Sequence, residues 1–233
     1  MVHSNVSIPL RVTGRQQESG GCLSLLFERP AGFDYQAGDW IDINAGSPSS
    51  CYDLAGGKTY SLSSSPTEPH LSICFRPGQS PLKRWLADAR PGDTLTVTQY
   101  GNDHGFGLSP RRHSLLVAGG IGVAPFRSIL KHAVDTGSQD SATLIHLNRD
   151  DDVPLGDDVR AIISRLPNVS YSALLTGEMK AKQRRQALLG LLRKDAAAYY
   201  LAGPPAMVAS TKDALLAAGI SAEDIATDVF DGY

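Results

Sequence analysis

The feature that most constrains the fold is the glycine run Gly119–Gly122, because it separates two segments of different periodicity. Before it, Leu115–Ala118 is a continuous apolar run, which is typical of a strand buried on both faces. After it, apolar residues recur at helical spacing over Phe126–Val134, and Pro125 suits the first turn of a helix. The run therefore predicts a strand-turn-helix unit of a parallel sheet.

Glycines at such a turn have two interpretations. They can bring backbone amides at a helix N-terminus close to a phosphate, or they can simply permit a tight turn. The strand before Gly119 and the helix after Gly122 favour nucleotide binding. Pro125 occupies the position of the third small residue of the usual dinucleotide fingerprint, which indicates a different nucleotide-binding family.

The same periodicity divides the chain into two expected domains, 1–109 and 110–233. The first has short apolar runs broken by Gly, Pro and Ser, which predict an antiparallel β-barrel with one helix. The second alternates strands with amphipathic helices, which predicts a parallel α/β sheet of Rossmann-like type covered on both faces. The expected strands are Ile8–Val12, Leu23–Phe27, Trp40–Ile43, Leu71–Phe75, Thr94–Thr98, Leu115–Ala118, Thr143–Leu147, Ser170–Leu175, Ala198–Ala202 and Ile225–Val229. The expected helices, besides the one after the glycine run, are Pro81–Ala89, Asp157–Leu166, Lys182–Arg193 and Ala206–Ala218.

Composition narrows the function classes. A net charge of -2 over 233 residues gives no global basic excess for nucleic acid. No apolar run reaches the roughly 18 to 20 residues that span a bilayer, and the start has no signal-peptide pattern, so we expect a soluble cytoplasmic protein. The three cysteines and six histidines lack metal-ligand spacing, so we expect no metal site. A redox centre would then be organic and its partner a separate molecule.

Four motifs, in this order, resemble those of the ferredoxin-NADP reductase superfamily, in which an FAD-binding barrel precedes a nicotinamide-binding domain. Lys58–Ser63 resembles the family's Arg-x-Tyr-Ser motif, and Gly119–Pro125 resembles Gly-Gly-x-Gly-x-x-Pro. Ala202–Met207 resembles Cys-Gly-Pro-x-x-Met, and Asp228–Tyr233 resembles Glu-x-Phe-x-Gly-Tyr. The segment Phe33–Trp40 also resembles the opening of the family's barrel sheet, so the match spans nearly the whole chain.

The resemblance implies an FAD-dependent NAD(P)H oxidoreductase. Hydride would pass from C4 of NADPH or NADH to N5 of FAD, and electrons would pass on to a separate acceptor such as ferredoxin, flavodoxin, an oxygenase component or a small molecule. Two alternatives stay open. One is an NAD(P)H:flavin reductase that uses free flavin as substrate, and the other is a non-catalytic electron-relay subunit of a larger complex.

The resemblance also assigns roles near the reacting atoms. It implies that Tyr60 packs against the isoalloxazine and that Ser61 hydrogen-bonds flavin N5. Phe230 would cover the flavin face, Asp228 stands in place of the family's Glu, and Tyr233 would pack on the flavin or the adenine. The catalytic candidates are therefore Ser61, Asp228 and Phe230.

Three positions depart from the family pattern or leave its register open. Lys58 replaces an arginine that contacts the pyrophosphate, so the charge is kept but the planar fork is lost, which predicts weaker FAD binding. Ala202 replaces a cysteine beside the reacting carbon. Either Ser80, as a helix cap, or Lys83 would meet a phosphate.

Coenzyme choice should depend on side chains near the adenosine ribose. Arg149, Thr176 and the pair Arg184-Arg185 favour the 2'-phosphate of NADPH, whereas Asp150–Asp152 would repel it, so both coenzymes remain open. Each motif also has a plain structural interpretation as a strand, capped helix, turn or solvated charge run. The cofactor-binding candidates are Lys58, Tyr60, Ser61, Leu62, Ser63, Arg76, Gly78, Ser80, Lys83, Gly119, Gly120, Gly122, Pro125, Arg149, Thr176, Arg185, Gly203, Pro204, Pro205, Met207 and Tyr233.

Overall fold

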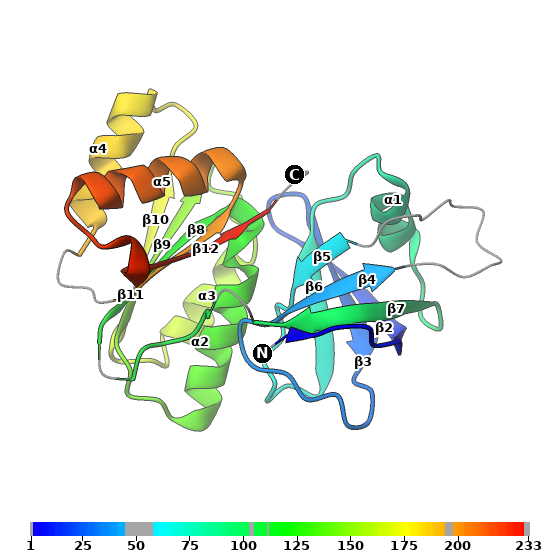
Figure 1. Ribbon diagram of the computed structural model, residues 1–233. Coiled ribbons are helices and arrows are strands. Elements are labelled where there is room, and N and C mark those ends of the chain that lie inside the picture. Colours follow the sequence, from blue (N-terminus) through cyan, green and yellow to red (C-terminus); the bar gives the residue numbers. More distant parts are fainter. Residues whose placement is uncertain (1, 45–57, 103–104, 111, 194–197, 231–233) are drawn as a thin grey trace.

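A computed structural model describes residues 2–44, 58–102, 105–110, 112–193 and 198–230. Two sheets lie side by side, one antiparallel and one parallel (Figure 1), so the predicted fold class is confirmed. The loop 45–57 and Tyr233 lie outside the described residues. All of the predicted strands and helices are present, with ends that differ from the expected ones by a few residues in most cases.

The first sheet is an antiparallel barrel-like sheet in the order β5-β4-β7-β2-β3-β6, with β1 paired to β7. A single bridge between Leu62 and Ile73 joins its two ends. β2 is longer than expected because it pairs with β7 over its first residues and with β3 over its last, which draws polar Arg15–Glu18 into a hairpin. The strands are β1 (Val2–His3), β2 (Ile8–Glu18), β3 (Cys22–Glu28), β4 (Trp40–Asn44), β5 (Lys58–Ser61), β6 (His70–Phe75) and β7 (Thr94–Gly101).

One helix, α1 (Pro81–Asp88), covers part of the barrel. Ser80 is its N-cap, and the Ser80 hydroxyl accepts a hydrogen bond from the Lys83 amide at 3.3 Å. Leu82 and Leu86 are buried in the barrel core. Ser80 is therefore the helix cap and Lys83 lies in the first turn, while which of the two would meet a phosphate stays a prediction.

The second sheet is parallel throughout, in the order β10-β9-β8-β11-β12. Helices α2 and α3 cover one face and α4 and α5 the other (Figure 1), because each sends an apolar stripe into a separate core. The strands are β8 (Ser114–Gly119), β9 (Ala142–Asn148), β10 (Val169–Leu175), β11 (Ala198–Gly203) and β12 (Ile225–Val229). The helices are α2 (Ala124–Thr136), α3 (Gly156–Ile163), α4 (Ala181–Leu191) and α5 (Pro205–Ala217), with 3-10 turns η1 (Gly120–Val123) and η2 (Ala222–Asp224).

The strand order reverses at β8, which has β9 on one side and β11 on the other. In an open parallel sheet the crevice at such a switch point, at the carboxyl ends of the strands, is where ligands bind. The glycine run forms η1 there, and Pro125 lies in the first turn of α2. A Cβ at Gly122 would lie 2.2 Å from the carbonyl oxygen of Ala202, so only glycine allows η1 to approach β11 this closely.

A buried histidine stabilises the glycine turn through a hydrogen bond. His146 of β9 is 0% exposed, and its Nε2 lies 2.7 Å from the carbonyl oxygen of Gly120. Because a carbonyl oxygen can only accept, Nε2 carries the hydrogen. Burial lowers the pKa of His146 to about 4, although the hydrogen bond to Gly120 opposes the shift. His146 is therefore a neutral donor that holds the turn.

The close approach at Gly122 predicts a large loss of stability on adding a methyl group. Gly122→Ala should lower the free energy of unfolding by about 2 kcal/mol, since the new Cβ meets backbone that cannot rotate away. Gly190→Ala is the matched control, because a Cβ added to Gly190 in α4 would have nothing within 4 Å, and it should raise stability by about 0.5 kcal/mol. Urea unfolding measures both values. Equal effects of the two substitutions would contradict the packing argument.

The pKa of His146 predicts a pH dependence of stability. Between the ordinary pKa of 6.5 and the folded value of about 4, the unfolded chain binds a proton that the folded chain does not. The free energy of unfolding should therefore fall by up to about 3 kcal/mol as the pH decreases through this window. Urea unfolding between pH 7 and pH 4.5 measures the slope. His146→Gln should flatten it, and an unchanged slope in this variant would refute the assignment.

Candidate functional site

The barrel and the parallel sheet meet through a hydrogen bond between two of the predicted catalytic residues. Ser61, at the end of β5, donates from its hydroxyl to Oδ2 of Asp228 in β12 at 3.1 Å. Ser61 is 8% exposed, so this contact is shielded from bulk water. Asp228 lies beside Ala202 in the strand register, which puts the pair next to the switch-point crevice.

Phe230 closes the same region from the carboxyl end of the chain. Its amide donates to the carbonyl oxygen of Gly203 at 2.9 Å, and its ring is 9% exposed within a core cluster that includes Ile121 and Ala202. A Cβ at Gly203 would lie 2.8 Å from the methyl group of Met207. The tertiary structure therefore brings together the glycine turn, the Gly203 loop and Phe230.

The proline and glycine motif after β11 begins a helix, as the sequence predicts. Pro204 is the N-cap of α5 and Pro205 is its first residue. Gly203 has a φ of +144°, a backbone conformation that side chains with a Cβ rarely adopt. Gly119 faces this motif, because a Cβ added to Gly119 would meet Pro204 at 2.9 Å. The N-terminus of α5 therefore packs against the carboxyl end of β8.

On the barrel, three cationic side chains lie within electrostatic reach of one another. Burial lowers the pKa of Lys83, and the charges of Lys58 and Arg76 lower it further. Lys83 is 6% exposed and runs past Gly78, where an added Cβ would lie 2.9 Å from Cδ of Lys83. The positive charge that Lys58, Arg76 and Lys83 bring together has the sign that would attract a pyrophosphate, as in FAD.

A second observation in the barrel also fits a bound cofactor. Tyr60 is 2% exposed, and its ring meets Phe75 edge-on at a centroid distance of 6.4 Å. In the part of the chain that the structure describes, its buried hydroxyl has no hydrogen-bond partner. Burial raises the pKa of Tyr60, so the hydroxyl keeps its proton and can donate to a ligand. The ring of Tyr60 packs in the barrel core. A contact of its hydroxyl with a cofactor is therefore easier to accommodate than the expected stacking of its ring on the isoalloxazine.

The next two residues of the same motif have structural contacts. Leu62 is 0% exposed in the barrel core. Ser63 pairs through its hydroxyl with that of Ser72 at 2.8 Å, and its carbonyl oxygen faces the second half of the chain. Their contact with a cofactor therefore stays a prediction.

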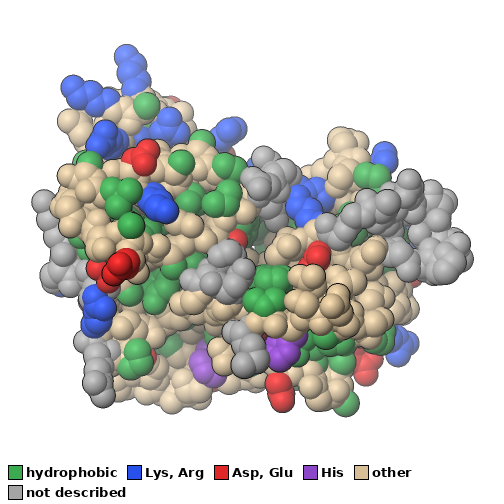
Figure 2. Space-filling model, in the orientation of Figure 1, with side chains coloured by type: hydrophobic (Ala, Val, Ile, Leu, Met, Phe, Trp, Pro, Cys, Tyr) green, Lys and Arg blue, Asp and Glu red, His purple; other side chains and the backbone are tan. Residues whose placement is uncertain are grey.

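Two of the three coenzyme-selecting candidates lie together. The amide and the hydroxyl of Thr176 donate to the carbonyl oxygen of Asn148 at 2.7 and 3.0 Å, and Gly177 donates to that of Arg149 at 2.8 Å. These bonds join the loops that follow β9 and β10. Arg185 lies elsewhere, in a groove between α4 and α5, where Figure 2 shows Lys and Arg side chains gathered over α4. Its proposed phosphate contact gains no support from this position.

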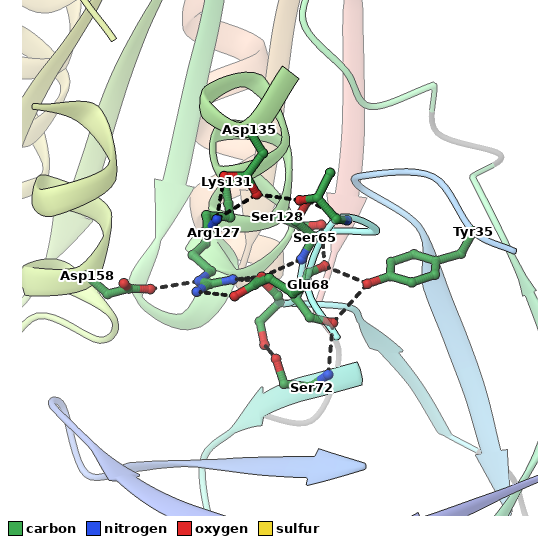
Figure 3. A network of polar contacts seen from close by, with 12 residues as sticks. Tyr35, Ser65, Glu68, Ser72, Arg127, Ser128, Lys131, Asp135 and Asp158 are labelled. Carbon is green, nitrogen blue, oxygen red and sulfur yellow. Dashed lines mark hydrogen bonds and ion pairs between the residues drawn. The ribbon is translucent and has the colours of Figure 1, made fainter. Parts of the chain in front are cut away.

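The site also contains residues that the sequence analysis missed. Arg127, in the first turn of α2, contacts Glu68 of the barrel, and Ser128 donates to the carbonyl oxygen of Ser64 at 2.6 Å (Figure 3). No spacing rule links residues about 60 positions apart. In the sequence, the only indication that Arg127 lies near the site is its position two residues after Pro125.

The described residues contain neither a recognisable metal site nor a membrane-spanning helix. Nowhere in them do three or more His, Cys, Asp or Glu side chains gather as a metal site would require. Among the same residues, no helix has the length and apolar character needed to cross a membrane.

Comparison with known proteins identifies the second half of the chain. Residues 116–213 match the family model of the oxidoreductase NAD-binding domain. The toluate 1,2-dioxygenase electron transfer component of Pseudomonas putida is 30% identical over 172 residues, covering 70% of this chain and 51% of that protein. The chain therefore spans about half the length of this relative, and it spans 9% of human dual oxidase 2, which is 31% identical over 153 residues.

Solved structures extend the likeness to both halves. The flavohemoglobin of Malassezia yamatoensis, with bound FAD and heme, superposes with a TM-score of 0.80 at 19% identity, covering 97% of this chain and 60% of that one. A ferredoxin NADP+ reductase from Neisseria gonorrhoeae, with bound FAD and NADP, has a TM-score of 0.76 at 18% identity, covering 97% and 99%. Residues 116–213 therefore carry an oxidoreductase NAD-binding domain, and the whole chain shares the two-domain fold of these flavoprotein structures.

Proposed function

We propose that the chain is an FAD-dependent NAD(P)H reductase, with an FAD-binding domain at 1–109 and an NAD(P)-binding domain at 110–233. The observation that carries the proposal is the hydrogen bond between Ser61 and Asp228. It joins the barrel motif to the carboxyl ends of β8 and β11, where Gly119 and Gly203 lie against each other. A flavin on the barrel and a nicotinamide in the crevice would meet at this bond.

When bound, FAD would accept hydride from the nicotinamide and release the electrons singly or in pairs. The residues of the chain supply binding and orientation. Lys58, Arg76 and Lys83 would hold the pyrophosphate by charge, and the amides of the glycine turn would hold the coenzyme phosphates. The Ser61 hydroxyl, oriented by Asp228, would support the reacting edge of the flavin.

Phe230 would exclude water from the reacting atoms and would move aside for the nicotinamide. Phe230 is buried, and its amide donates a hydrogen bond to the carbonyl oxygen of Gly203 at the end of β11. Asp228 accepts the hydrogen bond of Ser61 and would fix the orientation of that hydroxyl. Ala202 has no side chain that could take part in proton transfer, so these groups would act through position rather than through acid-base chemistry.

The acceptor we favour is an oxygenase component, which the likeness to the dioxygenase electron transfer component supports. Ferredoxin or flavodoxin would serve the same chemistry. Because nicotinamide coenzymes are held inside cells, the reductase would act in the cytoplasm. For the coenzyme, the neighbouring Arg149 and Thr176 support a contact with the ribose, and Asp150–Asp152 oppose a 2'-phosphate, so NADH and NADPH are tested separately.

An anaerobic titration tests the proposal. Protein reconstituted with FAD should bleach at the flavin band on addition of NADH or NADPH, and a soluble acceptor should restore the band. Bleaching of added free flavin without retention of FAD would support a flavin reductase, which the single charged group of Lys58 keeps open. Nucleotide binding without bleaching would support a relay subunit and contradict the reductase.

Ser61→Ala should lower the rate constant of flavin reduction about 100-fold, the order found on removing one preorganised hydrogen bond at a reacting group. The affinity for FAD should change little, because the substitution leaves Lys58, Arg76 and Lys83 in place. Anaerobic stopped-flow absorbance measures the rate constant. Ser164→Ala, in an exposed serine that bonds its own helix, is the control and should leave the rate constant unchanged. Equal rate constants for the two variants would rule out the role of Ser61.

A further inference from the structure

A polar network connects the two halves of the molecule beside the proposed flavin site (Figure 3). Arg127 is at its centre. Nη2 of Arg127 donates to Oε1 of Glu68 at 3.0 Å, and Nη1 donates to Oε2. Nη1 also donates to the carbonyl oxygen of Ser63 at 3.0 Å, and Nε donates to Oδ2 of Asp158 at 2.7 Å. One guanidinium therefore binds the barrel, α2 and α3 together.

The centre of the network is shielded from most of the solvent. The side chains of Arg127 and Glu68 are 14% and 12% exposed. Burial raises the pKa of Glu68, but the hydrogen bonds and charge of Arg127 outweigh it and lower the pKa below its ordinary value. Glu68 is therefore ionised at neutral pH. A planar guanidinium paired with a carboxylate through two bonds allows one relative orientation, which a point charge would not define.

Both ends of the network lie within a few residues of the reacting groups. Ser63, whose carbonyl oxygen Arg127 holds, is two residues beyond Ser61. Arg127 itself is two residues beyond Pro125 of the glycine turn. Ser128 adds a bond to the carbonyl oxygen of Ser64, which also accepts from the hydroxyl of Tyr35 at 3.3 Å. The segment that carries Ser61 is thus tied to the helix that carries the glycine turn.

We propose that Arg127 is a positioning residue that sets the distance between the flavin on the barrel and the nicotinamide in the crevice. This inference rests on the proposed function. Hydride transfer depends steeply on that distance, because a misplacement of about 1 Å can cost about 100-fold in rate. Arg127 touches neither reacting group; it acts through Ser63 and the glycine turn. Ser61 and Asp228 form a further contact across the same junction.

Two variants of Arg127 separate positioning from general adhesion. Arg127→Leu removes all four hydrogen bonds, and Arg127→Lys keeps the charge beside Glu68 but loses the fork. The expected result is a fall of about 10- to 100-fold in the rate constant of flavin reduction at saturating coenzyme, with intermediate loss in the lysine variant. The Kd for FAD should stay within about twofold and the long-wavelength charge-transfer absorbance should weaken, since geometry rather than binding is lost.

A double-mutant cycle and a matched control sharpen the test. Glu68→Gln combined with Arg127→Leu should slow flavin reduction no further than Arg127→Leu alone, because both changes break one contact. Arg160→Leu is the control, since Arg160 pairs with Asp157 inside α3 and should leave the rate constant unchanged. Rate constants equal to wild type in folded Arg127→Leu and Arg127→Lys would overturn the inference.

Hydrogen exchange gives a readout independent of turnover. In the protein without coenzyme, Arg127→Leu should speed amide exchange over 61–68 and the first turn of α2, and Arg160→Leu should not. Unchanged exchange in Arg127→Leu would overturn the inference. If wild-type protein holds FAD but neither coenzyme reduces it, the proposed function fails, and the exchange comparison still decides whether Arg127 fixes the junction.

Discussion

The contact on which the rest of the site depends is the approach of the glycine turn to β11. A side chain at position 122 would clash with β11, because its Cβ would lie 2.2 Å from the carbonyl oxygen of Ala202. Because glycine has no Cβ, η1 lies directly on the end of β11, and Gly119, Gly203 and Met207 pack into one layer. His146 also holds the turn, through its hydrogen bond to the carbonyl oxygen of Gly120.

Hydride transfer between the two domains would also require a fixed orientation of the barrel relative to the carboxyl ends of the parallel strands. Polar contacts provide this orientation, among them the Ser61–Asp228 hydrogen bond and the Arg127–Glu68 pair. Apolar packing also crosses the junction, since Phe106 stacks on Phe126 with ring centroids 5.4 Å apart. Apolar contacts supply adhesion without direction, whereas hydrogen bonds of fixed geometry supply orientation. The proposed hydride transfer needs the second property more than the first.

Charged side chains form local clusters, although the net charge of the chain is only -2. Lys83 is buried near Lys58 and Arg76, which gives this part of the barrel a local excess of positive charge. The Glu68 carboxylate, by contrast, is paired with the guanidinium of Arg127 across the junction. The small net charge therefore conceals local clusters of charge with different surroundings.

Much of the fold was predictable from the sequence, because strand and helix periodicity, the Ser80 cap and the glycine turn before Pro125 are encoded by neighbouring residues. The motif order also indicated the superfamily. The tertiary structure alone decided which distant side chains meet. Ser61 and Asp228 are 167 positions apart, and Arg127 and Glu68 are 59 apart. It also separated Arg185 from Arg149 and extended β2 into a polar hairpin. The reason is physical: local patterns determine how each element forms, whereas contacts between elements depend on how two separately packed sheets come together.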